Sequence, residues 1–508
     1  MMMEEDFVVV FDCGATHVTA MAIDGKGTVA KSASYPNEPV RQPGGEEGWL
    51  IWDVEQIWRK MCDACKQVCV SVGKDRVKAV TVCTFGADGA PIRRDGNLTY
   101  PAISWQDVRT ESLVREIGNL IDPWEIFVET GYQIVHFNTL LRLMWLREHS
   151  PKALDEAEYW LMMPGLLSFK LSGEFSIDPT SAGTMMAMSL EKRDWSERML
   201  SLAKLDSSFF PRWVEPGDVI GHVPPGVSRR TGLPTNVPVV AAGHDTQFAA
   251  IGSAARVGEV ILSSGTWEIL MLRTSGFHPS RFGFEEGLLF ENDAVRGSWN
   301  PQLFMMASGV IEWIREYFYG SIADSTEAYR QMIIEAKKIQ PGADGVTVLP
   351  SFVAEAGPTR KYGVRGTILG LTLNTDRSHL CRAAFEGLSF QLRHALDILS
   401  EATEFHVEGI RVVGGGAKND LWNQIRADVT GLPVRTIEQK EATSIGAALF
   451  AFVGAGVFKS LEEAQTGFAK KETVFNPTAR KIAYDDLFKK YIQLPPALKG
   501  FYAPACSE

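Results

Sequence analysis

Short apolar segments joined by tight polar turns open the chain. Residues 7–11 and 18–23 are apolar and flank the turn Asp12-Cys13-Gly14-Ala15-Thr16, and a further turn at 24–27 leads into an extended segment at 28–34. Strands that are joined by turns this short must pair as antiparallel neighbours. The sequence therefore predicts an N-terminal antiparallel hairpin with a glycine-containing turn.

A second hairpin of the same kind is predicted near the middle of the chain. Residues 259–262 read as a strand, Ser263-Ser264-Gly265-Thr266 as its turn, and residues 267–272 as the return strand. Two halves that each open in this way indicate a duplicated architecture with a cleft between the halves. We place the boundary near residues 246–258, which gives predicted domains of residues 1–250 and 251–508.

Strands and helices alternate in the rest of the sequence. The pattern predicts strands at residues 77–82, 237–241 and 410–413, and helices at 108–117, 140–147 and 379–399. This alternation favours the α/β class.

Composition and charge narrow the class of protein. The 508 residues are 45% hydrophobic and 22% charged, typical of a soluble globular protein, and the net charge is −11. This balance carries no electrostatic footprint for nucleic acid or an anionic membrane. The acidic N-terminus does not resemble a signal peptide, and no apolar run approaches the ~20 residues of a membrane-spanning helix. Seven cysteines are a sparse, odd number that argues against a disulfide framework, so we expect a cytoplasmic protein.

Three of the cysteines, Cys62, Cys65 and Cys69, could suggest a zinc site. They share a helical face with apolar residues at spacings of three and four, beginning at Val54. Cysteine is among the most buried residue types, and no fourth ligand is nearby in the sequence. We interpret the three cysteines as core packing.

The sequence contains no P-loop motif, G-x-x-x-x-G-K-[ST]. The two hairpin turns offer another way to bind phosphate, because successive backbone N–H groups in such a turn can form an anion-binding concavity. Thr16 and Thr266 would add hydroxyl donors, and Asp12 suits Mg²⁺ bridged through water. Ordinary hairpins are the alternative, but the matching positions in the two halves favour phosphate binding.

A third glycine cluster, Gly414-Gly415-Gly416-Ala417-Lys418-Asn419, lies between a predicted strand and a predicted helix. A dinucleotide site is one interpretation, since Glu438 follows at about 20 residues, as a ribose-binding acid would. The third glycine of that fingerprint is Asn419 here, and no second nucleotide-binding half follows. Together with the two hairpins, the cluster fits better as a platform for the adenosine end of ATP.

Asp245 is the candidate catalytic base. It follows the predicted strand 237–241, just before the second hairpin, and would project into the cleft. There it could accept the proton of a substrate hydroxyl, as the catalytic aspartate of kinases does. His244 is the competing base, and a helix N-cap is the structural alternative for Asp245.

Asp88 and Trp105 carry a weaker signal. Asp88 follows another predicted strand, but the pair Asp88-Gly89 is also a common turn. Trp105 precedes a predicted helix, and its aromatic face suits the apolar side of a sugar. Neither segment indicates a function unaided.

Two longer segments resemble the signatures of the FGGY carbohydrate kinases, within the actin-like ATPase superfamily. Residues 137–149 (FNTLLRLMWLREH) are similar to the first signature, with Arg142 where lysine is usual. GTILGL at 366–371 and HLCRAAFE at 379–386 fit the second signature. The resemblance runs from about residue 7 to about residue 455. It implies two duplicated actin-like, ribonuclease H-like ATPase domains around a catalytic cleft.

The resemblance also implies the residues that bind the nucleotide. Asp12, Gly14 and Thr16 match the first phosphate loop, Gly265 and Thr266 match the second, and Gly309, Gly415, Gly416 and Asn419 match ADP contacts. Family members often carry arginine where this chain has Thr19. Any phosphate contact of that arginine is therefore missing or supplied elsewhere.

The remaining roles follow from the same resemblance. Asp245 matches the catalytic base, Asp88, Trp105 and Asp245 fall at sugar-binding positions, and Asp12 and Asp245 are the expected Mg²⁺ ligands.

The implied activity is transfer of the γ-phosphoryl of ATP to the 1-hydroxyl of a ketose. Residues 12–16, 84–90, 243–249 and 262–271 are most similar to family members that act on L-fuculose, with rhamnulose and xylulose as alternatives. An actin-like ATPase without a sugar substrate and a nicotinamide dehydrogenase are alternatives of other classes. We expect ATP, Mg²⁺ and a small sugar as ligands, no nucleic acid or membrane partner, and allow for a homo-oligomer.

Overall fold

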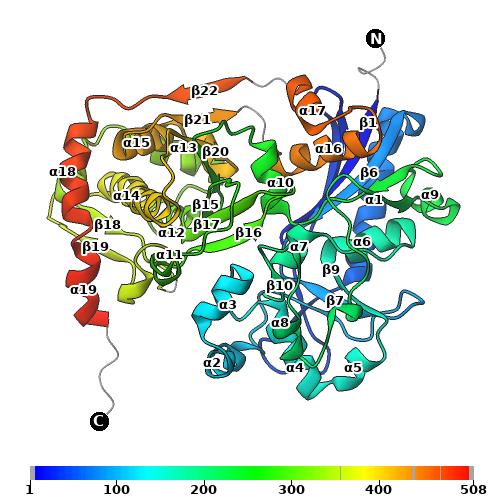
Figure 1. Cartoon of the computed structure of the whole chain (residues 1–508). Helices are drawn as coiled ribbons and strands as arrows, with labels where there is room; N and C mark the ends of the chain where they lie inside the picture. The colour runs from blue at the N-terminus through cyan, green and yellow to red at the C-terminus, as the bar shows by residue number, and fades with distance from the viewer. Residues whose placement is uncertain (1–5, 355, 438–440, 469–470, 503–508) are drawn as a thin grey trace.

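Two mixed β-sheets, one from each half of the chain, are each built around a predicted hairpin (Figure 1). The computed structural model describes residues 6–354, 356–437, 441–468 and 471–502. The first sheet has the order β12-β13-β6-β1-β2-β3. Its strands are β1 (Phe7–Cys13), β2 (His17–Asp24), β3 (Val29–Pro36), β6 (Val77–Thr84), β12 (Val219–His222) and β13 (Pro238–Val240).

The second sheet has the order β16-β17-β15-β14-β20-β21-β22. Its strands are β14 (Glu259–Ser264), β15 (Trp267–Met271), β16 (Leu289–Asn292), β17 (Trp299–Met306), β20 (Gly409–Val413), β21 (Val434–Ile437) and β22 (Glu472–Phe475). In both sheets the first hairpin strand pairs antiparallel with its return strand and parallel with a later strand, β6 in one sheet and β20 in the other. This repeat confirms the predicted duplicated α/β fold.

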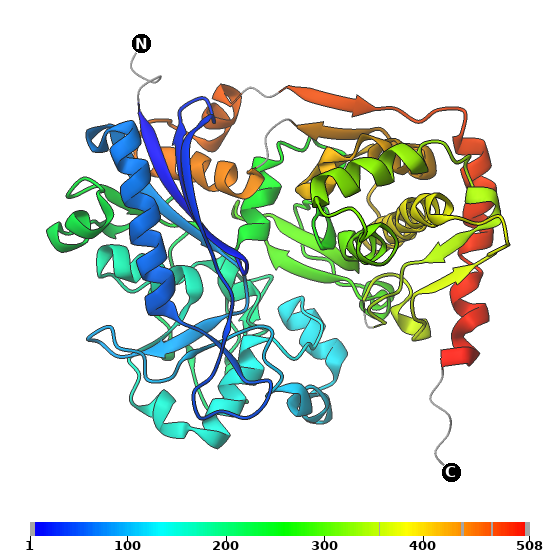
Figure 2. The ribbon, with the colours of Figure 1, turned by 180° about the vertical axis from the view of Figure 1, so that it is seen from behind.

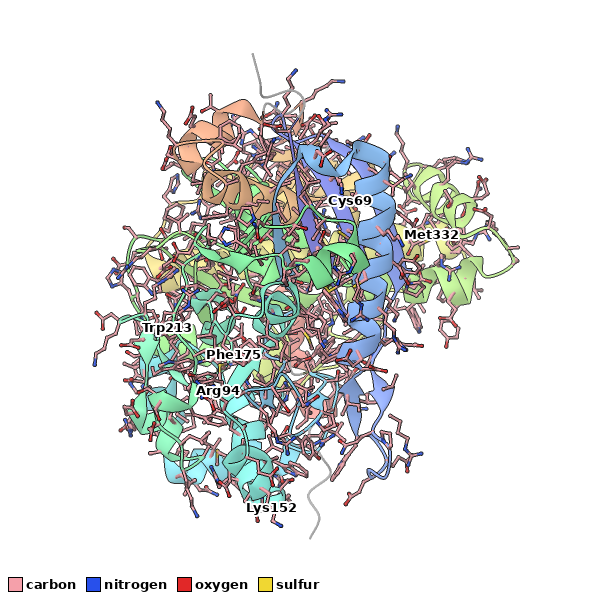
Figure 3. All side chains as sticks on the ribbon, turned by 90° about the vertical axis from the view of Figure 1, so that its right-hand side faces the viewer. Cys69, Arg94, Lys152, Phe175, Trp213 and Met332 are labelled. Carbon is pink, nitrogen blue, oxygen red and sulfur yellow. The ribbon has the colours of Figure 1, made fainter. Side chains whose placement is uncertain are left out.

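Helix α1 (Val54–Val72) packs against one face of the first sheet. Cys62, Cys65 and Cys69 are buried there beside Trp58 and Met61, and Figure 3 labels Cys69 on this helix. Within the described ranges no group of three or more His, Cys, Asp or Glu residues could hold a metal ion. The cysteines therefore belong to the core, as predicted.

A pair of helices from different halves of the chain lies between the two sheets. α10 (Asp245–Gly252) and α16 (Ala442–Gly454) bury Phe248 and Ile445 against the first sheet. The same pair contributes Ala249 and Ala442 to a smaller cluster with the second sheet. α17 (Leu461–Gly467) also adds to the core of the first sheet, and Figure 2 shows these C-terminal helices beside the N-terminal strands.

Glycines allow the two central helices to touch. A Cβ atom added to Gly446 would lie 1.9 Å from the Phe248 carbonyl oxygen, and one added to Gly252 would lie 1.8 Å from the Ala442 carbonyl oxygen. The halves of the sequence are thus not independent packing units, because a helix after residue 441 covers the first sheet. The domain limits 1–250 and 251–508 stay a prediction.

Helices α14 (Arg377–Thr403) and α15 (Asp420–Thr430) cover the other face of the second sheet. The outer layer of this half consists of α12 (Ser308–Tyr319), α13 (Ser325–Ala336), α18 (Lys481–Tyr491) and α19 (Leu494–Tyr502), with the strands β18 (Thr347–Leu349) and β19 (Thr367–Leu369). Among the described helices none is long and apolar enough to cross a membrane.

The remaining elements lie mostly in a lower lobe of the first half (Figure 1). Its helices are α2 (Glu111–Leu120), α3 (Pro123–Thr130), α4 (Thr139–His149), α5 (Pro151–Asp155), α7 (Pro179–Gly183) and α8 (Glu197–Ser201). α6 (Met163–Ser172) instead adds to the core of the first sheet. Short strands are β4 (Val40–Arg41), β5 (Leu50–Trp52), β7 (Gly89–Ile92), β8 (Ala102–Ile103), β9 (Tyr159–Met162), β10 (Met188–Ser189) and β11 (Asp194–Trp195). Elsewhere lie α9 (Pro225–Thr231) and α11 (Arg281–Glu286).

The helix predicted at 108–117 begins later, at Glu111. Asp107 instead accepts hydrogen bonds from the backbone N–H groups of Leu50 and Arg109, at 2.5 and 2.9 Å. This pairing holds residues 107–110 in a turn outside the helix, because the carboxylate competes for backbone donors.

Candidate active site

Asp245 is the first residue of α10, at the point where the chain leaves β13 and enters the space between the sheets. Its side chain is 31% exposed, and Oδ1 accepts a hydrogen bond from the Thr246 N–H at 2.7 Å. The N-cap of this helix is His244, so the structural alternative for Asp245 does not hold. A carboxylate in the first turn is favoured by the helix dipole.

Asp12 gathers with other carboxylates at the end of β1. Burial, together with the negative charges of Asp245 and Glu441, raises the pKa of Asp12 to about 7. Like charges that are held this close favour a bound cation. Since no group of three or more His, Cys, Asp or Glu residues within the described part of the chain could hold a metal, other ligands would have to come from water and phosphate, as is usual for Mg²⁺.

His244 lies between two carboxylates. Its Nδ1 is 3.0 Å from Asp245 Oδ1, and its Nε2 is 3.5 Å from Glu291 Oε2. Burial alone would lower the pKa of His244, but Glu291 and Asp245 outweigh it and raise the pKa to about 9. A histidine that is protonated at neutral pH is a poor proton acceptor. The raised pKa of His244 therefore favours Asp245 over His244 as the base.

Glu291, on β16, was not predicted from the sequence. It is buried and accepts hydrogen bonds from the Tyr132 hydroxyl at 2.5 Å and from Gln247 Nε2 at 2.6 Å. Tyr132, Glu291 and the His244–Gln247 segment are far apart in the chain. No local pattern could have revealed this contact between the halves.

The two hairpin turns have similar geometry. The Gly14 N–H donates to the His17 carbonyl and the Gly265 N–H donates to the Trp267 carbonyl, each at 2.9 Å. These two amides therefore close their own turns. Thr16 and Thr266 are exposed residues at the tips of the turns, and Thr16 Oγ1 hydrogen-bonds with His17 Nδ1 at 3.2 Å.

Two of the predicted nucleotide segments of the second half, the hairpin turn and the Gly415–Lys418 turn, meet at Ser264. The Gly309 N–H donates to the Thr266 carbonyl at 3.3 Å, at the start of α12. A Cβ atom added to Gly416 would lie 2.0 Å from Ser264 Oγ, so the Gly415–Lys418 turn touches the hairpin. Asn419 caps α15 by accepting from the Trp422 N–H at 3.1 Å. Glu438, on which the dinucleotide interpretation depended, lies outside the described residues.

Asp88 is enclosed by donors from three parts of the first half. Oδ2 accepts from Trp52 Nε1 at 2.6 Å and from the Trp105 N–H at 3.0 Å, and Oδ1 accepts from Arg142 Nη1 at 2.6 Å. Burial raises the pKa of Asp88, while Arg142 opposes that shift. Arg142 thus has a defined partner at the position where the first signature usually has lysine.

Trp105 is half-buried, so part of its ring is accessible. The loop that carries Asp88 also touches the base region, since a Cβ atom added to Gly86 would lie 3.0 Å from His244 Cε1. The structure therefore joins the Asp88–Trp105 pair to His244 and Asp245. Asp88 has no exposed surface, and its direct contact with a sugar stays a prediction.

Thr19 faces Asp12 across the first hairpin in the sheet register. Its hydroxyl hydrogen-bonds with Ser34 Oγ on β3 at 2.8 Å. Thr19 therefore ties two strands together at the position where family members often carry arginine.

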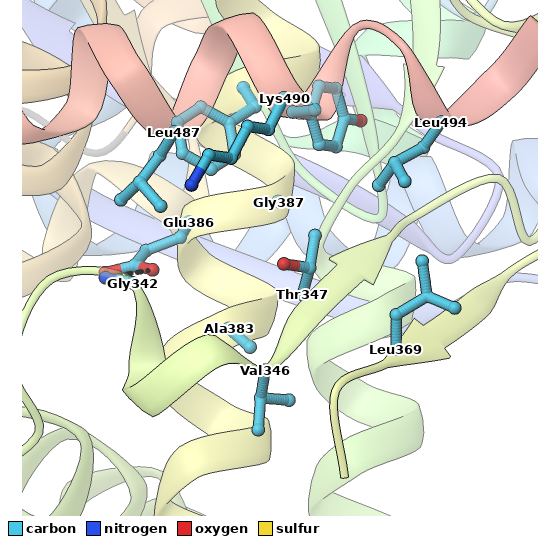
Figure 4. Close-up of a pocket in the computed structure, with 12 residues that line it drawn as sticks. Gly342, Val346, Thr347, Leu369, Ala383, Glu386, Gly387, Leu487, Lys490 and Leu494 are labelled. Carbon is cyan, nitrogen blue, oxygen red and sulfur yellow. Dashed lines mark hydrogen bonds between the residues drawn. The ribbon is translucent and has the colours of Figure 1, made fainter.

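A cavity of about 210 Å³ lies apart from these residues, between α14, β18–β19 and α18–α19. Figure 4 shows Glu386, from the second signature, beside Gly342 in its wall. Glu386 accepts from the Gly342 N–H at 3.0 Å and from Arg382 Nε at 2.6 Å, so this signature residue ties α14 to its surroundings. None of the predicted site residues lines the cavity.

Comparison with known proteins identifies the class. The models for the N-terminal and C-terminal domains of the FGGY family of carbohydrate kinases match residues 7–252 and 260–455. The chain belongs to this family, as the signatures indicated, and is a carbohydrate kinase.

Relatives by sequence include an L-fuculokinase of Escherichia coli, 38% identical over 476 residues that cover 94% of this chain and 98% of the relative. An L-fuculokinase of Haemophilus influenzae is 33% identical, with 90% and 96% covered. A xylulose kinase of Bacillus subtilis is 25% identical, with 96% of each covered.

Solved structures share the fold. A xylulose kinase from Rhodospirillum rubrum superposes with a TM-score of 0.87 at 23% identity, covering 98% of this chain and 99% of that one. A Plasmodium falciparum glycerol kinase with ADP gives 0.84 at 21% identity, covering 97% and 98%.

Proposed function

We propose that this chain transfers the γ-phosphoryl of ATP to the 1-hydroxyl of a ketose, with L-fuculose as the acceptor. The observation that carries the reaction is the position of Asp245 on a helix packed between both sheets, within electrostatic reach of Asp12. The similarity to L-fuculokinases supports the sugar. Rhamnulose and xylulose stay alternatives within the same mechanism.

Asp245 acts as the general base in this proposal. Its carboxylate accepts the proton of the sugar hydroxyl as that oxygen attacks the γ-phosphorus, and ADP leaves. The cationic His244 lies 3.0 Å from the Asp245 carboxylate and stabilises its negative charge. Asp88 acts through Trp105, whose backbone it holds, so that the ring supports the apolar side of the sugar.

The nucleotide is held by the second half and by both hairpins. Thr16 and Thr266 supply hydroxyl donors to the phosphates, and Gly309, Gly415 and Gly416 let the adenosine approach the backbone. Asp12 and Asp245 would hold Mg²⁺ with water and phosphate oxygens. When bound, the ion neutralises charge on the transferred phosphoryl group.

The test is an ADP-release assay with ketoses, polyols and aldoses as acceptors. L-fuculose is expected to give the largest kcat/KM, and a strong preference for another sugar would overturn the substrate but not the class. ATP hydrolysis that is indifferent to every sugar would favour an actin-like ATPase instead. Cytoplasmic location and homo-oligomerisation stay predictions.

Asp245→Asn tests the base separately. Loss of a general base costs about 10²–10⁴-fold in turnover. The variant should therefore lose this much kcat and still bind ADP with nearly unchanged affinity by calorimetry. An Asp245→Asn enzyme that keeps near-full activity would contradict the assignment.

A further inference from the structure

A completely buried ion pair lies beneath the predicted nucleotide-binding segments. Glu268, on β15, and Arg426, on α15, have no exposed surface. Arg426 Nη2 donates to Glu268 Oε1 and also to Ser264 Oγ, the latter at 2.8 Å. Ser264 Oγ donates in turn to Glu268 Oε1 at 2.7 Å. The three side chains form one closed polar group.

This group joins both strands of the second phosphate hairpin at its base. Ser264 and Glu268 are partners in the antiparallel register, directly below the turn formed by Gly265 and Thr266. Their side chains meet on the same guanidinium group, Arg426. The hairpin is therefore held by Arg426 as well as by its own backbone hydrogen bonds.

The same guanidinium group connects to the glycine turn after β20. Arg426 Nη1 donates to Asn423 Oδ1 at 2.9 Å, and Asn423 Nδ2 donates to the Ala417 carbonyl at 2.8 Å. The Trp422 ring lies 3.7 Å from the Arg426 Cζ atom and supports the guanidinium from one side. One arginine thus bridges the phosphate hairpin and the turn that contains Gly415 and Gly416.

Stability alone does not account for this arrangement. A buried ion pair is often no more stabilising than apolar residues of similar volume, because both charges lose their hydration. Glu268 Oε2 is also buried without a hydrogen-bond partner among the described residues, which adds a further cost. The hydrogen-bonded pair does, however, fix the geometry between the two attached segments, which an apolar pair would not.

We propose that Glu268 and Arg426 are positioning residues for the nucleotide. They hold the hairpin that receives the phosphates and the turn that receives the adenosine at one spacing, without touching ATP themselves. This role rests on the proposed function, since it assumes that Gly265, Thr266, Gly415 and Gly416 bind ATP. It predicts that breaking the pair weakens nucleotide binding and leaves sugar binding unchanged.

The experiment compares Arg426→Met with Arg382→Met. Arg382 and Glu386 form a second buried ion pair in the same half, at 2.6 Å, next to α18 rather than to the nucleotide segments. Both variants should lower the melting temperature. Arg426→Met alone should raise the Kd for ADP and the KM for ATP by about 10–100-fold, since small misplacements of binding groups carry costs of this order. The KM for the sugar should stay within about two-fold of wild type, and Arg426→Lys should restore part of the ADP affinity because it keeps the charge.

Two outcomes would overturn the role. One is a folded Arg426→Met protein that binds ADP as wild type does, and the other is an equal rise in the KM values for ATP and sugar. If Arg426→Met does not fold, the double variant Glu268→Leu/Arg426→Met leaves no unpaired charge, and it must show the same selective loss of ADP binding. Calorimetry with ADP alone separates the two proposals. A wild-type chain that does not bind ADP overturns the proposed function as well. Unchanged ADP binding in the variants overturns only the positioning role.

Discussion

The buried ion pair between Asp88 and Arg142 allows a quantitative test of how the region around the proposed sugar-binding residues is stabilised. Asp88 is fully buried and the Arg142 side chain is 1% exposed, so both charged groups are shielded from solvent. Replacing Arg142 by Met removes the 2.6 Å bond to Asp88 and a 2.9 Å bond to the Ala87 carbonyl. Removing one partner of a buried pair typically costs about 3–5 kcal/mol, because the remaining charge stays unpaired.

The predicted loss can be measured as a shift in melting temperature. For a domain of roughly 150–250 residues, each kcal/mol corresponds to about 2–4 °C. If the part of the chain around Asp88 unfolds as a unit of that size, its transition in Arg142→Met should move down by about 6–20 °C in scanning calorimetry. Trp52 and Trp105 both donate to Asp88, so tryptophan fluorescence should follow the same transition.

Arg147→Met is the matched control, because Arg147 lies on the same helix and pairs with Asp155, whose side chain is 60% exposed. Such a surface pair contributes about 0–1 kcal/mol, and the control should melt close to wild type. Arg142→Lys, which restores the usual signature residue, keeps the charge and should fall between wild type and Arg142→Met. An Arg142→Met protein that melts within about 2 °C of wild type would refute the reasoning.

Three further predictions concern the helices and the metal. Gly446→Ala should lower both thermal stability and kcat. The new Cβ would lie 1.9 Å from the Phe248 carbonyl oxygen and would displace the helix that starts at Asp245. Thermal melts and turnover assays test this. Asp376→Ala should cost about 1 kcal/mol, since Asp376 caps α14 through the Ser378 and His379 N–H groups. Hydrogen bonds from Ser378 and His379 lower the pKa of Asp376 to about 2. The cap therefore stabilises the fold above the unfolded pKa of about 4 and is lost as the pH falls toward 2, so the difference between variant and wild type should shrink over that window in urea titrations. Chelation by EDTA should abolish sugar-dependent ADP release and added Mg²⁺ should restore it, because Asp12 and Asp245 are the proposed Mg²⁺ ligands. Activity that is indifferent to EDTA would count against both ligands.

The duplicated hairpins could be predicted because their information is local. A short turn with glycine between two apolar segments fixes antiparallel pairing, and both predicted hairpins occur within a few residues of their expected limits. The cysteine-bearing face of α1 was predictable for a similar reason, since helical periodicity is contained in about five turns of sequence. The start of α2 was not predictable, because the competing acceptor, Asp107, accepts a hydrogen bond from the backbone N–H of Leu50 on β5.

The polar contacts that organise the site were beyond sequence reasoning. Glu291 meets Tyr132 and Gln247, and Arg426 meets Glu268, across separations of more than 40 residues. Buried glutamate and arginine residues are indistinguishable in sequence from exposed ones until the fold supplies their partners. The family resemblance predicts residues that contact ligands, but it gives no indication of the buried side chains around them.

The position of Asp245 follows from both kinds of information. Its place after a strand and before a hairpin is local. Its place between the two sheets depends on α16, which comes from the far end of the chain and packs on α10 through Gly446 and Phe248. The α10–α16 pair contributes to cores with both sheets, so neither sheet can shift against the pair without losing buried contacts. A movement that brings the hairpin tips toward each other would therefore displace Thr16 and Thr266 more than Asp245, because Asp245 lies on the α10–α16 pair. The proposed base thus lies at the start of a helix that packs against both sheets.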